Sequence, residues 1–217
     1  MCWARGPSIT AADDGPPCSQ HMTAKAGTFL DSRTGAFVDD VLAVIDPSVP
    51  VLEAFLLGSG AVGGFDPRTS DVDLVVVIER PLSTERANVL RRLAALETPV
   101  RDLELVIYVE GSQPPAFELN LNGGVERPNE EPFWFVLDAA VAQEHAVPVW
   151  GGRRWDEFFA PIPPDRTREA MKESLRWAEQ QLPNDEFARL HAARARHYLA
   201  FGEWITKNEA DGCGAGW

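Results

Sequence analysis

The chain lacks the features that mark secreted, disulfide-bonded and membrane-spanning proteins. Its three cysteines, Cys2, Cys18 and Cys213, form no clustered spacing, which argues against a disulfide framework or a zinc site. No run of eighteen apolar residues is present, so no membrane-spanning helix is expected. The first thirty residues have no apolar segment of the kind found in signal peptides. Together these absences predict a cytoplasmic protein.

Positive charge is also scarce. Lysine and arginine number 20 against 33 aspartate and glutamate residues, which gives a formal net charge of −13. Nonspecific nucleic-acid binding is therefore not expected, because it depends on a basic surplus that neutralises phosphates. An acidic surface suits cationic partners such as Mg²⁺ or an aminosugar, although composition alone does not separate this from a role in solubility. The length of 217 residues allows one large domain or two small ones.

The most informative motif is Gly58-Ser59, followed after eleven residues by Asp71-Val72-Asp73 at the head of the apolar run 74–78. A Gly-Ser turn lets the backbone approach a phosphate closely, since glycine adopts positive φ without strain. Two aspartates at i and i+2 on a strand share a face, roughly 6–7 Å apart. Such a pair can hold one or two divalent cations that in turn position a triphosphate. The combination predicts nucleotidyl transfer, against the alternative of a solvated carboxylate pair.

A third carboxylate interrupts the strand-like run 101–109. Glu104 lies at the end of this run that is expected beside the Asp71–Asp73 strand. A carboxylate there could complete the metal site or take the proton from an attacking hydroxyl. Asp102 is the second choice for this base. The alternative is that both residues are polar positions at a strand start that face water.

The order of elements predicts an α+β fold. Residues 1–28 are expected to be a disordered extension, and Met22 is a second candidate start. Apolar periodicity and turn residues then predict a sheet domain over 29–160 and a helical domain, partial and possibly truncated, over 161–217, with a Pro-rich joint between them. The predicted strands are 51–57, 74–78, 101–109 and a short edge strand within 117–124, and the predicted helices are 34–45, 83–97, 134–144, 167–181 and 186–201.

These motifs resemble the aminoglycoside adenylyltransferases that modify streptomycin and spectinomycin, which belong to the polymerase-β-like nucleotidyltransferase superfamily. The resemblance is carried by 55–59, Gly63-Gly64, 70–74 and 103–106, and it extends through 117–120 and 137–145 into 194–207. It therefore covers nearly everything from about residue 33 onward. It implies a nucleotidyltransferase sheet domain followed by a helical domain, with ATP and the drug between them.

The resemblance also implies a role for individual residues. Gly58 and Ser59 would contact the triphosphate, Asp71, Asp73 and Glu104 would form the Mg²⁺ site, and Glu104 would act as base. Arg194 and Lys207 fall at phosphate-binding positions, and Trp177 and Asp185 fall near drug-contacting positions. Solvated helix charges are the alternative for Arg194 and Lys207, and a place in the core is the alternative for Trp177.

The chain departs from the family pattern in two places. Gly123-Gly124 stands where the family has a tryptophan, and the family's helical domain continues beyond the position of Trp217.

The expected activity is transfer of AMP from Mg-ATP to a hydroxyl of a small cationic antibiotic such as streptomycin or spectinomycin, which would give resistance. One alternative is a nucleotidyltransferase with another acceptor, such as a protein hydroxyl in a toxin–antitoxin pair. Another is a truncated, inactive nucleotide-binding module.

Overall fold

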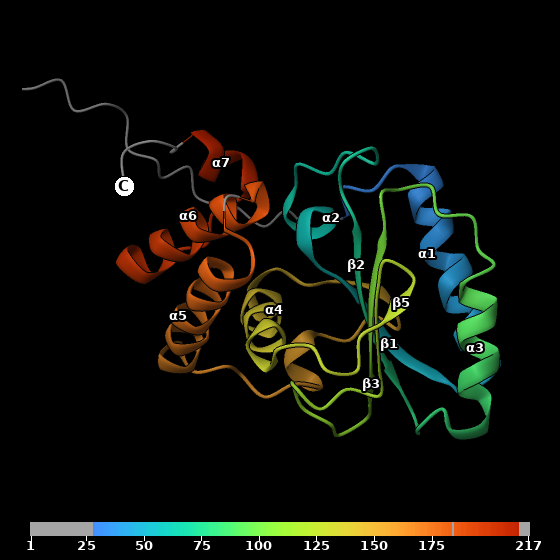
Figure 1. Ribbon diagram of the computed structural model, residues 1–217. Coiled ribbons are helices and arrows are strands. Elements are labelled where there is room, and N and C mark those ends of the chain that lie inside the picture. Colours follow the sequence, from blue (N-terminus) through green and yellow to red (C-terminus); the bar gives the residue numbers. More distant parts are fainter. Residues whose placement is uncertain (1–27, 184, 213–217) are drawn as a thin grey trace, which may run out of the picture.

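A six-stranded mixed sheet forms the centre of the protein, and helices cover both of its faces (Figure 1). The computed structural model describes residues 28–183 and 185–212. Nearly all of the predicted disordered extension, 1–28, therefore lies outside the described residues. Within them, no helix is both long and apolar enough to cross a membrane.

Strands come first in the chain and long helices last, as the sequence pattern predicted. The strands are β1 Val51–Leu56, β2 Val72–Ile78, β3 Leu103–Val109, β4 Leu119–Asn122, β5 Val125–Glu126 and β6 Val147–Trp150. The helices are α1 Ser32–Ile45, α2 Gly58–Val62, α3 Arg86–Leu93, α4 Pro132–His145, α5 Pro164–Gln181, α6 Glu186–Phe201 and α7 Lys207–Gly212. Two 3₁₀ turns, η1 Ser83–Glu85 and η2 Trp155–Glu157, complete the set.

The strand order across the sheet is β5-β4-β3-β2-β1-β6. The central pair, β2 and β3, is parallel, and every other neighbouring pair is antiparallel. A parallel pair requires a crossover connection, which η1 and α3 supply here. Because β2 and β3 lie inside the sheet, they read as the near-continuous apolar runs expected for strands covered on both faces.

One face of the sheet packs against α1 and α3. The side chain of Asp31 caps α1 by accepting a 2.8 Å hydrogen bond from the Thr34 backbone N–H. The buried face of α1 carries the apolar residues whose spacing predicted the helix: Phe37, Val41, Leu42, Val44 and Ile45. This face of the sheet therefore forms the larger hydrophobic core, and it contributes no residue to the predicted site.

The other face packs against α4, which belongs to two cores at once. Ala139 and Ala142 contact the sheet side chains Phe55 and Tyr108 in one cluster. Residues from the same helix pack against α5 and α6 in another cluster, made of Phe133, Val136, Leu137, Ala170, Met171, Ala195 and Tyr198. The predicted domain boundary at 160/161 stays a prediction, because α4 lies before it in the chain yet packs on both layers.

Several elements differ from the prediction, and strand β6 was not predicted at all. Helix α3 ends at Leu93 instead of 97, because 94–96 continue in tighter turns, with the Ala95 N–H donating to the Arg92 carbonyl at 3.2 Å. Strand β4 is not the edge of the sheet, since Val125–Glu126 pair with it as a further strand. Periodicity did not predict α7 because the helix has only six residues.

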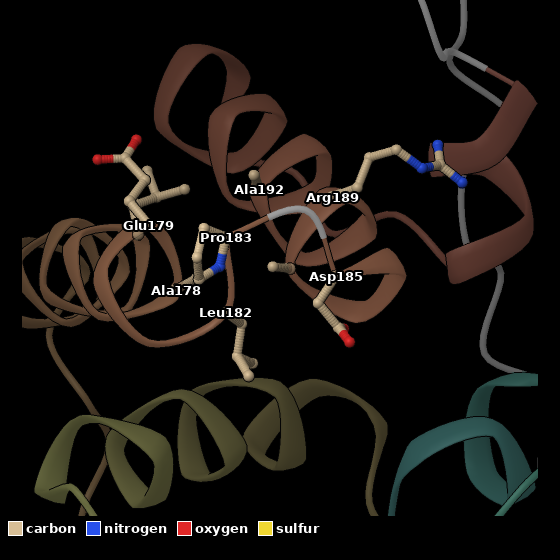
Figure 2. Close-up of a pocket in the computed structure, with 9 residues that line it drawn as sticks. Ala178, Glu179, Leu182, Pro183, Asp185, Arg189 and Ala192 are labelled. Carbon is tan, nitrogen blue, oxygen red and sulfur yellow. The ribbon is translucent and has the colours of Figure 1, made fainter.

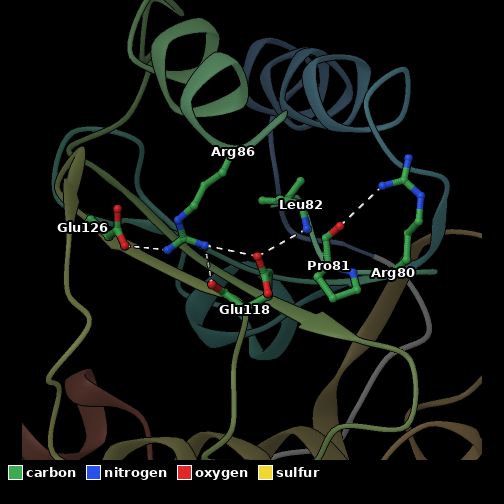
Figure 3. A network of polar contacts seen from close by, with 6 residues as sticks. All are labelled: Arg80, Pro81, Leu82, Arg86, Glu118 and Glu126. Atoms are coloured by element: carbon green, nitrogen blue, oxygen red, sulfur yellow. Dashed lines mark hydrogen bonds and ion pairs between the residues drawn. The ribbon is translucent and has the colours of Figure 1, made fainter. Parts of the chain in front are cut away.

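A polar network fixes the β4–β5 hairpin to the rest of the sheet domain (Figure 3). Arg86, at the start of α3, donates to the Glu118 carbonyl at 2.6 Å and to the Glu126 carboxylate at 2.5 Å. Glu118 in turn accepts a 3.3 Å hydrogen bond from the Leu82 backbone N–H. Bonds of this kind between charged groups are stronger than neutral ones, so the network holds the hairpin that carries Asn122 in place.

A second polar anchor lies at the opposite edge of the sheet. Glu53 in β1 is fully buried, and its carboxylate accepts hydrogen bonds from the backbone N–H groups of Gly152, at 2.6 Å, and Arg153, at 3.0 Å. A Cβ at Gly151 would come within 2.3 Å of the same carboxylate. Glu53 therefore fixes the turn that follows β6.

Candidate active site

The centre of the site is a row of polar side chains across three neighbouring strands. In the strand register Asp73 of β2 lies opposite Glu104 of β3, and Glu104 lies opposite Asn122 of β4. The Asn122 side-chain amide donates to Glu104 Oε1 at 3.2 Å. All three are half-buried. The structure thus places Glu104 next to Asp73, as its position in the sequence predicted.

The backbone at Gly58 comes directly against this row. Gly58 follows β1 with φ of +54°, and a Cβ at this position would lie 1.7 Å from Asp73 Oδ2. The preceding Leu57 N–H donates to the Asp73 carbonyl at 2.8 Å. Glycine is required here both for the left-handed conformation and for space. Ser59 follows as a half-buried residue of the short helix α2.

Negative charge accumulates in this row. Burial is the main cause that raises the pKa of Asp73 well above its ordinary value, and the carboxylates of Glu104, Asp138 and Asp71 add to it. Burial and the charge of Asp71 likewise raise the pKa of Glu104. A hydrogen bond between the two carboxyl groups favours a protonated Asp73 beside an ionised Glu104. Such a cluster holds protons tightly, or a cation in their place.

Asp71 lies at the same end of the sheet, just before β2, but it has a partner of its own. Arg101 donates to both of its carboxylate oxygens, through Nε at 2.8 Å and through Nη2. Over the residues that the structure describes, no three His, Cys, Asp or Glu side chains converge closely enough to form a ready metal site. Asp102, the second choice for the base, accepts instead from the Leu103 N–H at 3.0 Å.

Sequence reasoning missed one carboxylate of the site. Asp138 projects from α4 with an exposed side chain, so only partial desolvation against the sheet, together with the negative charge of Glu104, raises its pKa above the ordinary value. Glu130 adds further negative charge near it. The signal was a single carboxylate within the otherwise apolar stretch 135–142 of a helix.

The helical layer brings two cations to this site. Arg194 of α6 donates from Nε to the Ile205 carbonyl at 2.9 Å, and it attracts the carboxylates of Asp138 and Asp73. Lys207 is the first residue of α7, where its positive charge lowers the pKa of Glu104. Both positive charges therefore act on the carboxylate row, and the contact of these residues with phosphate stays a prediction.

Reciprocal hydrogen bonds between Thr206 and Glu209 fix the start of α7. The Thr206 N–H donates to the Glu209 carboxylate at 2.7 Å, and the Glu209 N–H donates to the Thr206 hydroxyl at 3.2 Å. Lys207 lies within this capped turn. Its backbone is therefore held in place although its side chain is exposed.

The two predicted drug-contacting residues lie in the helical layer. Trp177 of α5 is half-buried and meets Trp134 edge to face, with ring centroids 5.5 Å apart. Asp185 is exposed and caps α6, accepting from the Phe187 N–H at 2.8 Å. It also lines a pocket of ≈290 Å³ between α5 and α6 (Figure 2). Trp177 does not line this pocket, and none of the residues that line it belongs to the carboxylate row. The contact of Trp177 and Asp185 with a drug therefore stays a prediction.

A buried histidine contacts the aromatic residues of the helical layer. His191 packs edge to face against Trp134 at 5.0 Å, and its Nε2 lies 2.8 Å from the Ser174 hydroxyl. That hydroxyl donates to the Met171 carbonyl at 2.9 Å, so it accepts from an Nε2–H of His191. Burial, with the charge of Arg194, lowers the pKa of His191 to about 4. The imidazole is therefore neutral in the folded protein.

Comparison with known proteins identifies the fold. No family model matches the chain. Among solved structures, the chain is similar to the spectinomycin adenyltransferase AAD(9) from Enterococcus faecialis, solved with ATP and spectinomycin. The TM-score is 0.70 at 20% identity, over 83% of this chain and 81% of that chain. The predicted α+β fold is confirmed, and it is the fold of this adenyltransferase, the kind of enzyme that the motifs resemble.

Proposed function

We propose that the protein transfers AMP from ATP to a hydroxyl group of an aminoglycoside or aminocyclitol such as spectinomycin or streptomycin, and so confers resistance. One observation carries the proposal: Asp73 and Glu104 lie side by side on parallel strands, with the Gly58 backbone directly against Asp73. This arrangement combines a carboxylate pair with a backbone that approaches closely enough to cradle a phosphate. The fold shared with an adenyltransferase supports the same reaction.

Asp71, Asp73 and Glu104 are the residues that would hold Mg²⁺. Their chemistry fits a hard cation, because all three offer carboxylate oxygens. Burial, and after it the charge of neighbouring carboxylates, raises the pKa of Asp73 and of Glu104, and a bound cation would offset both effects. Bound Mg²⁺, expected as two ions, supplies charge neutralisation on the triphosphate and on the departing pyrophosphate.

Glu104 is the proposed base. The acceptor hydroxyl gives its proton to the Glu104 carboxylate, its oxygen forms a bond to the α-phosphorus, and the bond from that phosphorus to the bridging oxygen breaks to release pyrophosphate. The hydrogen bond from Asn122 orients the carboxylate. Burial and the charge of Asp71 raise the pKa of Glu104, which strengthens it as a base relative to an ordinary glutamate, and the hydrogen bond with Asp73 and the charge of Lys207 oppose that rise.

The remaining residues would bind the two substrates. Gly58 and Ser59 would contact the triphosphate, and Arg194 and Lys207 would neutralise its charge from the helical layer. Trp177 and Asp185 would contact the drug. The excess of carboxylates around the site favours an acceptor that carries ammonium groups, because opposite charges attract most strongly in a partly desolvated site.

The test is pyrophosphate release by purified protein with Mg-ATP, alone and with spectinomycin, streptomycin and unrelated aminoglycosides. We expect release that depends on one of the first two drugs and disappears in Asp73→Asn. The matched control is Asp66→Asn, which removes a surface carboxylate whose side-chain partner is Arg68, outside the site. Expression in a drug-sensitive bacterium should raise the inhibitory concentration of the same drug. Drug-independent release, or no release from folded protein, would contradict the proposed acceptor.

A further inference from the structure

The ion pair between Arg101 and Asp71 occupies a position that the proposed reaction needs. Both oxygens of the Asp71 carboxylate accept hydrogen bonds from the Arg101 guanidinium, in the paired geometry that suits these two groups. The Asp71 side chain is only 9% exposed, whereas that of Arg101 is 56% exposed. The carboxylate is therefore fixed and enclosed, and the cation approaches it from the solvent side.

We propose that Arg101 is a built-in counter-ion of the site, which a divalent cation must displace from Asp71 before it can bind there. This inference rests on the proposed function in one respect, the role of Asp71 as a metal ligand. It adds a competition between Arg101 and the metal ion for Asp71, which the proposed function does not require. Arg101 is a positioning residue in this scheme, since it acts through Asp71.

The surroundings of Arg101 allow this exchange. Its backbone is held by a hydrogen bond from its N–H to the Ser70 carbonyl at 3.3 Å, so only the side chain has to move. The guanidinium is half in solvent, and an ion pair of that exposure contributes little net free energy. Water can replace the guanidinium contacts as the side chain leaves. A competing cation therefore displaces a guanidinium that is already half in solvent, although the Asp71 carboxylate itself is enclosed.

The same surroundings explain why Arg101 stays when no metal competes. Glu104 and Asp102 add negative charge near the guanidinium beyond that of Asp71. An acidic site without any cation would be costly, because like charges in a partly desolvated cluster repel one another. Arg101 offsets that repulsion in the nucleotide-free protein. The expected consequence is weak binding of divalent cations until Arg101 is displaced.

The experiment measures Mn²⁺ binding without nucleotide or drug, by the electron paramagnetic resonance signal of free Mn²⁺. Arg101→Ala should bind Mn²⁺ about fivefold more tightly than the unchanged chain, which is the effect of roughly one partly exposed ion pair. Arg68→Ala is the matched control, because Arg68 pairs with Asp66 outside the site and its loss changes the net charge equally. This control should leave the Mn²⁺ affinity unchanged, because the charge of the exposed Arg68 is screened.

A double-mutant cycle separates the specific competition from general electrostatics. In an Asp71→Asn background, Arg101→Ala should no longer raise the affinity. Arg101→Lys keeps the charge but loses the paired donors, so it should bind Mn²⁺ about twofold more tightly. This conservative variant decides the question if circular dichroism shows that Arg101→Ala does not fold.

The outcomes distinguish this inference from the proposed function. Equal Mn²⁺ affinity in the unchanged chain, Arg101→Ala and Arg101→Lys, with weaker binding in Asp71→Asn, overturns the competition and leaves the metal site standing. The same increase in Arg68→Ala as in Arg101→Ala also overturns it. If neither Asp71→Asn nor Asp73→Asn changes Mn²⁺ binding, the metal site in the proposed function is itself wrong.

Discussion

Substitution of Gly58 by alanine tests the geometry of the site most directly. The added Cβ would lie 1.7 Å from Asp73 Oδ2 and 2.7 Å from Asp73 Cγ, so the carboxylate has to rotate away from its place beside Glu104. The backbone, at φ of +54°, is also unfavourable for alanine. This conformation costs about 1–2 kcal/mol in stability for a residue with a Cβ. Displacement of a reacting group by about 1 Å is enough to lower turnover roughly 100-fold.

Gly111→Ala is the control that separates strain from displacement. Gly111 has φ of +83° in the turn after β3, and a Cβ there would meet no atom within 4 Å. It should lose about 1–2 kcal/mol in urea-induced unfolding and keep full drug-dependent pyrophosphate release. Gly58→Ala should lose at least as much stability and about 100-fold in release. Release within about threefold of the unchanged chain in Gly58→Ala would refute the placement of Asp73 against the turn.

Three further predictions follow from single residues. Glu104→Gln should lower drug-dependent pyrophosphate release by about 10²–10⁴-fold without loss of stability, as measured by release assays and urea unfolding, and near-normal release would exclude Glu104 as the base. His191 has a pKa lowered to about 4 in the folded protein, so the neutral imidazole contributes its full stability to the fold above the pKa of the unfolded chain. This stability is lost as the pH falls toward the folded-state pKa. Urea unfolding should show a loss of roughly 2 kcal/mol between pH 7 and pH 5 that is missing from His191→Gln, and parallel pH profiles would contradict this. Glu53→Ala should lose about 2–4 kcal/mol of stability in urea unfolding, because the N–H groups of Gly152 and Arg153 lose their acceptor. Glu53→Gln keeps an acceptor oxygen and should lose less. Equal losses in the two variants would show that these hydrogen bonds do not account for the stability that Glu53 provides.

The sequence predicted the part of the site that lies on neighbouring strands. Asp73 precedes a buried apolar run, and Glu104 interrupts the next one, so a parallel pairing of the two runs brings the carboxylates together. This inference needs only strand periodicity and the crossover rule. The Gly58-Ser59 turn was predicted as a place where the backbone approaches a phosphate, because glycine adopts positive φ without strain. The structure shows the positive φ and a close approach to Asp73, and the contact with phosphate stays a prediction.

The rest of the site depends on contacts that periodicity does not encode. Arg101 was predicted only as the start of a strand, because nothing in one sequence tells which carboxylate a neighbouring arginine will bond. Asn122 belongs to an alternating segment whose partner strand decides whether it faces Glu104 or solvent. Asp138 was not predicted because it lies in an otherwise apolar helix. Its proximity to Glu104 follows only from the packing of α4 over the sheet.

The distribution of charge between the two layers suits a second role for the helical layer, in addition to the phosphate binding proposed for it. The carboxylates lie at the sheet and on α4, whereas Arg194 and Lys207 add positive charge from α6 and α7 to that of Arg101 beside Asp71. Lys207 lowers the pKa of Glu104, and Arg194 lowers that of Asp138, in opposition to burial. Loss of either cation would therefore raise the pKa of the carboxyl group it faces. Because a base must be ionised to accept a proton, the hydrogen bond with Asp73 and the charge of Lys207 both favour the base role proposed for Glu104.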